Sequence, residues 1–335
     1  MTMKYLKGLA IMLLAFLMLY LAGPRPAKPE YSTVLPEVPS EALALEQYIR
    51  DQEAQHAIKP NNEARIVWAN DTLRTPTEYA LVYLHGFSAS QMEGDPVHRN
   101  LAAHFGMNLY LSRLQDHGID TTVPLGGMTA QGLWESAVQA LAIGKKLGKK
   151  VILMSTSTGG TLSLKLAAEF PEIAGQILLS PNIEINDNKA WLLNDPWGLQ
   201  IAQAVAGTYR IVSDTTAIYA RYWNNRYLMT APVELEQLLE TTMKRSVFER
   251  ITTPVLMLYY YKNEREQDPV VKVSAMKRMY GALGTPDSLK RELALPNTGD
   301  HVLASPIKSK DVASVEKACI EWGAQVLRLS PVAGQ

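Results

Sequence analysis

Short, almost continuously apolar runs that alternate with helical patterns are the feature of this sequence that most restricts its fold. Such runs are typical of strands buried on both faces of a parallel sheet, because a sheet with one wet face alternates apolar and polar residues. Strands that alternate with helices predict right-handed crossovers and an α/β fold, with a mostly parallel central sheet and helices on both faces. The expected strands are 65–69, 78–84, 107–112, 151–154, 176–180, 254–261 and 289–295, and the expected helices are 40–50, 96–105, 129–147, 161–170, 271–283 and 311–327.

The alternation breaks after residue 182 and resumes at about residue 250. No comparable apolar run occurs in this interval, and its pattern is helical. We therefore expect a helical cap insertion at about 183–250 within one α/β domain that spans 30–335. A chain of 335 residues is long enough for one large domain of this kind. The interval is rich in aromatic residues, namely Trp191, Trp197, Tyr209, Tyr219, Tyr222, Trp223 and Tyr227.

Residues 1–29 have the pattern of a targeting segment followed by a Pro-rich spacer. Lys4 and Lys7 precede an apolar run, which is the order of charge and hydrophobicity in an export signal. No small-x-small cleavage pattern follows the run, and this favours an uncleaved signal-anchor over a cleaved signal peptide. We expect a membrane-anchored chain with its main domain on the exported side, periplasmic or extracellular, held off the membrane by the spacer at 23–30. The alternative is secretion after cleavage.

Charge and cysteine content exclude several classes of function. Lys and Arg together number 33, as do Asp and Glu, so the net charge is zero and we expect no nucleic-acid partner. The single cysteine, Cys319, excludes an intramolecular disulfide and argues against a cysteine zinc site. We expect Cys319 to be a small core residue. Histidines are scattered, so we expect no metal ion, and we expect no cofactor.

The residues around Ser157 fit a sharp turn from a buried strand into a helix. Such a turn lifts the central side chain clear of the sheet, at a helix N-terminus that favours a developing anion. The flanking residues must be small, a requirement that Gly159 and Gly160 meet, and Ser155 stands where glycine is usual. Two other interpretations stay open. One is a plain helix N-cap, and the other is a phosphate-binding turn, although no Gly-x-Gly-x-x-Gly is present and no Lys follows Gly160.

Two further groups of residues in loops after predicted strands can assist a serine. Backbone N–H groups in the segment 85–87 (His-Gly-Phe) are able to form an anion-binding pocket with the N–H of Thr158. We expect His85 itself to be structural. Asp268 and His301 lie in loops after later strands, at the end where open α/β sheets bind ligands. A serine hydroxyl becomes nucleophilic when a histidine oriented by a carboxylate accepts its proton.

In combination, these residues resemble α/β-hydrolases with a helical cap, in the branch of monoacylglycerol lipases and bacterial carboxylesterases. The likeness spans about 65–327, and the order Ser, Asp, His is the order of that family. The matching motifs are His85-Gly86-Phe87, Ser155-x-Ser157-x-Gly159, Asp268 and Gly299-Asp300-His301.

The resemblance implies a catalytic triad with Ser157 as nucleophile, His301 as base and Asp268 as the acid that orients the base. Glu264 and Glu266 stay open as alternatives for the acid. The oxyanion hole implied by the family consists of the backbone N–H groups of Phe87 and Thr158.

The function implied is hydrolysis of carboxylic esters through an acyl-enzyme on Ser157. The aromatic cap favours an apolar acyl chain, as in a monoacylglycerol or a lysolipid. A peptidase or amidase, an acyltransferase, and a non-catalytic scaffold on the same fold stay open. The expected partners are a small-molecule or lipid ester and, through the N-terminal segment, a membrane.

Overall fold

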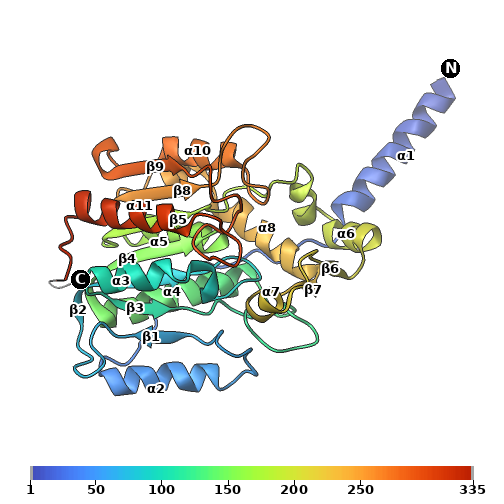
Figure 1. Cartoon of the computed structure of the whole chain (residues 1–335). Helices are drawn as coiled ribbons and strands as arrows, with labels where there is room; N and C mark the ends of the chain where they lie inside the picture. Colours follow the sequence, from blue (N-terminus) through green and yellow to red (C-terminus); the bar gives the residue numbers. More distant parts are fainter. Residues whose placement is uncertain (1–2, 333–335) are drawn as a thin grey trace.

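A mostly parallel seven-stranded sheet forms the centre of the computed structural model, which describes residues 3–332 (Figure 1). The strand order is β1-β3-β2-β4-β5-β8-β9, and only the pairing of β1 with β3 is antiparallel. The predicted fold class is therefore confirmed. The strands are β1 Arg65–Val67, β2 Thr77–Leu84, β3 Asn108–Leu111, β4 Gly148–Thr156, β5 Gly175–Leu179, β8 Val255–Tyr259 and β9 Lys290–Ala294.

Strand β2 explains why the apolar runs are almost continuous. Its residues 80–84 are fully buried, and successive side chains enter opposite cores. Val82 packs in the core on one face, whereas Leu81 and Tyr83 pack in the core on the other. The first core is covered by α2 Ala42–Glu53, α4 Ala130–Leu147, α5 Thr158–Glu169 and α10 Val273–Ala282, and the second by α3 Val97–His104 and α11 Val312–Gln325.

The insertion between β5 and β8 forms the cap, which lies at one end of the sheet (Figure 1). Besides the helices, the cap contains two short strands that pair into an antiparallel ribbon. Strands of three residues are too short to show a period in the sequence. The cap elements are η2 Ala190–Asn194, α6 Gly198–Ala206, β6 Tyr209–Ile211, α7 Ala217–Tyr222, β7 Arg226–Leu228, α8 Thr230–Thr242 and α9 Arg245–Phe248.

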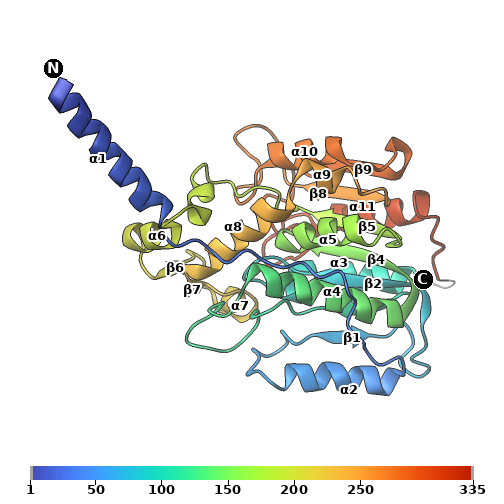
Figure 2. The ribbon, with the colours of Figure 1, turned by 180° about the vertical axis from the view of Figure 1, so that it is seen from behind.

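Helix α1 (Met3–Leu21) projects from the cap and away from the sheet, as both ribbon views show (Figures 1 and 2). All of its residues are exposed. Its C-terminal end is fastened to the cap, where the Tyr20 hydroxyl donates to Asp195 (2.9 Å) and the Trp197 indole donates to the carbonyl of Leu19 (3.1 Å). The backbone N–H of Trp197 also donates to the carbonyl of Pro24 (3.0 Å).

The segment 24–40 has no regular secondary structure and runs along the body (Figure 2). The Trp134 indole donates to the carbonyl of Ser32 (2.7 Å), and the hydroxyls of Tyr31 and Thr241 lie 2.6 Å apart. Residues 31 and 32, directly after the proposed spacer at 23–30, therefore lie against the body. The cap lies directly at the end of α1.

Candidate active site

Ser157 occupies a strained turn between β4 and α5. Its backbone has φ 53° and ψ −116°, a conformation that a residue with a side chain adopts only when its surroundings hold it. Its N–H donates to the carbonyl of Leu179 (2.9 Å), and its own carbonyl accepts from the N–H groups of Gly160 (2.8 Å) and Asn182 (2.9 Å). The ends of β4 and β5 thus fix the turn that was predicted.

Close backbone contacts explain the small residues on both sides of this turn. A Cβ on Gly159 would lie 2.0 Å from the carbonyl oxygen of Leu84, and one on Gly160 would lie 2.7 Å from Cβ of Pro181. Ser155, in the position usually held by glycine, is fully buried, and its hydroxyl donates to the carbonyl of Ile177 (3.3 Å). The serine therefore fits the turn and adds a bond to β5.

His301 and Asp268 are in direct contact. Nδ1 of His301 lies 2.7 Å from Oδ2 of Asp268, and both side chains are buried. The other oxygen, Oδ1, accepts from the N–H groups of Val270 (2.9 Å) and Val271 (3.0 Å). Burial opposes ionisation of Asp268, but the charge of His301 and these three hydrogen bonds leave its pKa below the ordinary value. Asp268 is thus a carboxylate with both oxygens occupied.

The two alternative acids point elsewhere. Glu264 accepts from the hydroxyl of Tyr261 (2.9 Å), and Glu266 pairs with Lys262 (3.0 Å), all on the exposed part of the loop. Neither glutamate is hydrogen-bonded to His301 in the part of the chain that the structure describes.

Ser157 and His301 share the carboxyl edge of the sheet, following β4 and β9 respectively. They are 5% and 6% exposed, so both lie beneath the surface. Within residues 3–332 the Ser157 hydroxyl makes no hydrogen bond to the imidazole. Such a bond often forms only when a substrate is bound. The structure therefore joins two of the three expected residues directly and places the third at the same edge.

The segment that carries Phe87 is held by two neutral histidines. His85 contacts the carbonyl of Gly86 through Nδ1 (2.9 Å) and accepts the N–H of Leu114 at Nε2 (3.0 Å). His117 accepts the N–H of Ser88 at Nε2 (3.0 Å). Burial lowers the pKa of both rings, to about 4 for His117, so each stays uncharged. The structural role expected for His85 agrees with these contacts.

The N–H groups of Phe87 and Thr158 were expected to bind an oxyanion. Thr158 begins α5 directly after Ser157, and Phe87 follows Gly86, whose Cα faces Ser157. Neither N–H donates a hydrogen bond within residues 3–332. Two free donors beside a serine are what stabilisation of an oxyanion requires.

Glu93 in η1 (Gln91–Gly94) is a buried acid at this site that the sequence analysis missed. Its Oε2 accepts the N–H of Gly86 (2.6 Å). A Cβ built on Gly86 would lie 3.0 Å from both Oε1 of Glu93 and Cβ of Ser157, so the two side chains border the same small space. Burial raises the pKa of Glu93 to about 7, although the charge of His301 favours the ionised form. In the sequence, residues 91–95 (Gln-Met-Glu-Gly-Asp) have no apolar pattern that would predict burial.

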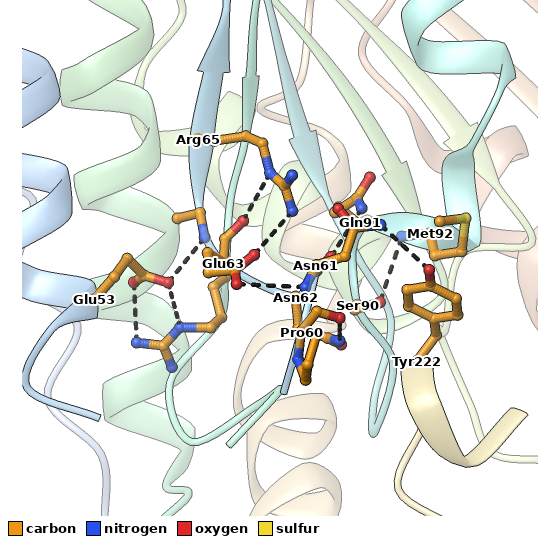
Figure 3. A network of polar contacts seen from close by, with 12 residues as sticks. Glu53, Pro60, Asn61, Asn62, Glu63, Arg65, Ser90, Gln91, Met92 and Tyr222 are labelled. Carbon is orange, nitrogen blue, oxygen red and sulfur yellow. Dashed lines mark hydrogen bonds and ion pairs between the residues drawn. The ribbon is translucent and has the colours of Figure 1, made fainter. Parts of the chain in front are cut away.

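Polar contacts tie the segment before β1 to η1 and to the cap (Figure 3). The Gln91 amide donates to the carbonyl of Asn61 (3.2 Å), and the Asn61 amide donates to the hydroxyl of Tyr222 (3.2 Å). Next to them, the Lys59 ammonium donates to the Asn224 amide oxygen (2.8 Å). Because Tyr222 ends α7, these bonds hold that helix over η1 and over Glu93.

The described residues do not form a metal centre. In residues 3–332, no group of three or more His, Cys, Asp or Glu side chains is placed to hold a metal ion. Cys319 is fully buried, and burial raises the pKa of its thiol. It lies on the inner face of α11 and packs in the core that this helix covers.

Comparisons with known proteins agree with this architecture. A sequence model of the alpha/beta hydrolase family matches residues 81–311. No curated protein matches the chain.

Among solved structures, one from work on the metagenome-derived lipolytic enzymes LipS and LipT is 17% identical, with a TM-score of 0.64, over 81% of this chain and 99% of that chain. The monoacylglycerol lipase of Paleococcus ferrophilus is 15% identical, with a TM-score of 0.57, and the match covers 80% of this chain and 98% of the lipase chain. Est1E from Butyrivibrio proteoclasticus with ferulic acid bound is 14% identical, with a TM-score of 0.55, and the match covers 79% of this chain and 95% of the Est1E chain. At these identities the likeness establishes the fold.

Proposed function

The chain belongs to the alpha/beta hydrolase family, and on this premise we propose that it is a serine hydrolase of carboxylic esters. The observation that supports this most is the strained turn at Ser157 together with the His301–Asp268 hydrogen bond of 2.7 Å at the same edge of the sheet. Strain of this kind persists where the surroundings enforce it, and it gathers at functional sites. A scaffold without activity requires neither feature.

The reaction would run through an acyl-enzyme. The hydroxyl oxygen of Ser157 attacks the ester carbonyl while Nε2 of His301 takes the hydroxyl proton, and Asp268 stabilises the imidazolium. The N–H groups of Phe87 and Thr158 would bind the oxyanion. His301 then returns the proton to the departing alcohol. A water molecule, deprotonated by the same ring, releases the acid and regenerates Ser157.

We infer an apolar acyl chain, of the monoacylglycerol or lysolipid type, from the cap and from its position. Large apolar side chains on the cap point into solvent, and α1 ends at the cap. A monoacylglycerol lipase is among the similar structures. The exposed cap residues are Trp191, Ile201, Val205, Ile211 and Ile218.

We also propose that α1 is a signal-anchor that keeps the enzyme at a membrane on the exported side. The helix has 19 residues, a length of about 28 Å at 1.5 Å per residue, which is close to the apolar thickness of a bilayer. Its length and composition suffice for a span, and no part of it is buried in the protein. Bilayer lipid would cover an apolar surface that the protein leaves open.

A fluorophosphonate probe tests the serine chemistry. Full-length protein in detergent should be labelled covalently, and Ser157→Ala should abolish the labelling. Ser155→Ala is the matched control, because Ser155 lies in the same turn but is fully buried beneath Ser157. Absence of labelling in the wild type, or labelling that survives Ser157→Ala, contradicts the proposal. Hydrolysis of para-nitrophenyl esters compared with aminoacyl amides separates an esterase from a peptidase.

A further inference from the structure

Glu93 lies next to Gly86 and Ser157 in the candidate site, although the reaction described above does not use it. Its carboxylate accepts the N–H of Gly86, the residue before the donor Phe87. It also borders the space next to Cβ of Ser157. A buried hydrogen bond of 2.6 Å, to a side chain that is 2% exposed, is a strong constraint on the backbone that donates it.

The cap packs against the helix that carries Glu93. Helix α7 contacts η1, and the Trp223 side chain directly after α7 is buried and stacks on Tyr219 at 5.2 Å between ring centroids. The N–H of Asn224 donates to the carbonyl of Ser88 (2.8 Å). The oxyanion segment and the cap therefore meet at Glu93.

The charged and titratable groups around Glu93 come from three parts of the fold. His301 and Asp300 approach from the loop after β9, Tyr83 from β2 and Tyr219 from α7. Of these, only His301 can carry a positive charge. In its ionised form, Glu93 therefore adds to Asp268 a second negative charge that acts on the imidazole, with a smaller contribution from Asp300.

We propose that Glu93 is a positioning residue of the proposed hydrolase, which holds the oxyanion segment at Gly86 against the cap and supplies a second negative charge to His301. The proposal rests on the proposed function for its role in the reaction. The effect of the Glu93 charge on the protonation of His301 can be measured whether or not the protein is an active hydrolase.

Two variants separate the hydrogen bond from the charge. Glu93→Gln keeps an oxygen that can accept the N–H of Gly86 but removes the negative charge. Glu93→Ala removes both. Without the charge the imidazolium loses a stabilising neighbour, so the pKa of His301 should fall in each variant. Without the hydrogen bond the oxyanion segment loosens, so Glu93→Ala should also lower the probe-labelling rate at high pH by roughly tenfold.

The experiment is an NMR titration of full-length protein in detergent with ¹³C-labelled histidine, in which His301→Gln assigns the signal among six histidines. The matched control is Glu236→Gln. Glu236 is a second buried glutamate whose pKa burial raises to about 7, but its charged neighbours are Glu240, Glu184, Lys272 and Asp187.

We expect the His301 midpoint to move to lower pH in Glu93→Gln and Glu93→Ala and to stay in place in Glu236→Gln. An unchanged or higher midpoint in Glu93→Gln overturns the proposal, as does an equal shift in Glu236→Gln. Failure of the proposed function appears separately, as a wild-type protein that no fluorophosphonate labels, and the titration still tests Glu93 in that case.

Discussion

His301 and Asp268 lie 33 positions apart in the sequence, yet Nδ1 of the histidine is 2.7 Å from Oδ2 of the aspartate. Because the aspartate is ionised, Nδ1 of the ring carries the proton and donates a hydrogen bond to the carboxylate. This fixes the tautomer in which Nε2 is an acceptor. A histidine in that tautomer can take a proton from a serine hydroxyl, which is the task proposed for it.

Replacing Asp268 by asparagine should therefore impair catalysis far more than folding. The amide keeps the side-chain shape but can donate to Nδ1, which would place the ring proton on Nε2 and block proton transfer from Ser157. We expect kcat for para-nitrophenyl ester hydrolysis to fall about 10³- to 10⁴-fold. The controls Glu264→Gln and Glu266→Gln, on the same loop, should stay within about twofold. A larger loss in either control would reassign the acid.

The pH dependence of kcat/KM should follow the protonation of His301. Burial lowers its pKa, but the negative charges of Asp268, Glu93 and Asp300 more than compensate and leave the pKa above the ordinary histidine value of about 6.5. Only the neutral ring is a base, so activity should rise with pH through a midpoint above that value. Asp300→Asn removes one of the raising charges and should move the midpoint to lower pH. A midpoint that moves upward in Asp300→Asn contradicts this electrostatic account.

Local sequence patterns were sufficient to predict the sheet and the serine turn. Residues 80–84 are apolar because both faces of β2 are buried, so the strand is visible without knowledge of its neighbours. Gly159 and Gly160 likewise reflect a close approach that any residue with a Cβ would prevent. Asp268 and His301 were predicted from their places after β8 and β9, although their contact depends on the order of the strands.

The features that local sequence patterns did not predict depend on contacts between segments that are far apart in the chain. Glu93 lies in a short run typical of an exposed turn, but η1 packs against β2, β4 and α7, which buries it. The ribbon β6–β7 is stabilised by contacts such as the Arg226 guanidinium, 3.5 Å from the ring centre of Tyr209. The contact of Trp197 with the end of α1 likewise joins residues 178 positions apart in the sequence.

Gly159→Ala should destroy the serine turn. The new Cβ would lie 2.0 Å from the carbonyl oxygen of Leu84, and its three nearest atoms all belong to the backbone of Leu84 and His85, so no flexible side chain can move aside. We expect a loss of about 3 kcal/mol in the free energy of unfolding and loss of probe labelling. Gly281→Ala in α10 is the control, since nothing lies within 4 Å of its added Cβ, and it should stabilise the protein by up to about 1 kcal/mol. Thermal unfolding of both variants measures the difference.

If α1 spans a bilayer, the cap must lie at the membrane surface, because Tyr20 and Trp197 fasten the helix end to it. An environment-sensitive fluorophore on Val205→Cys, in α6, should then shift to the blue in liposomes and be quenched by spin-labelled lipid. Leu43→Cys is the control, because Leu43 is an equally apolar, exposed residue on α2, away from the cap (Figure 1). Cys319 is fully buried and should stay unlabelled. Equal quenching at the two positions, or protein that leaves the liposomes in carbonate, contradicts the anchored arrangement.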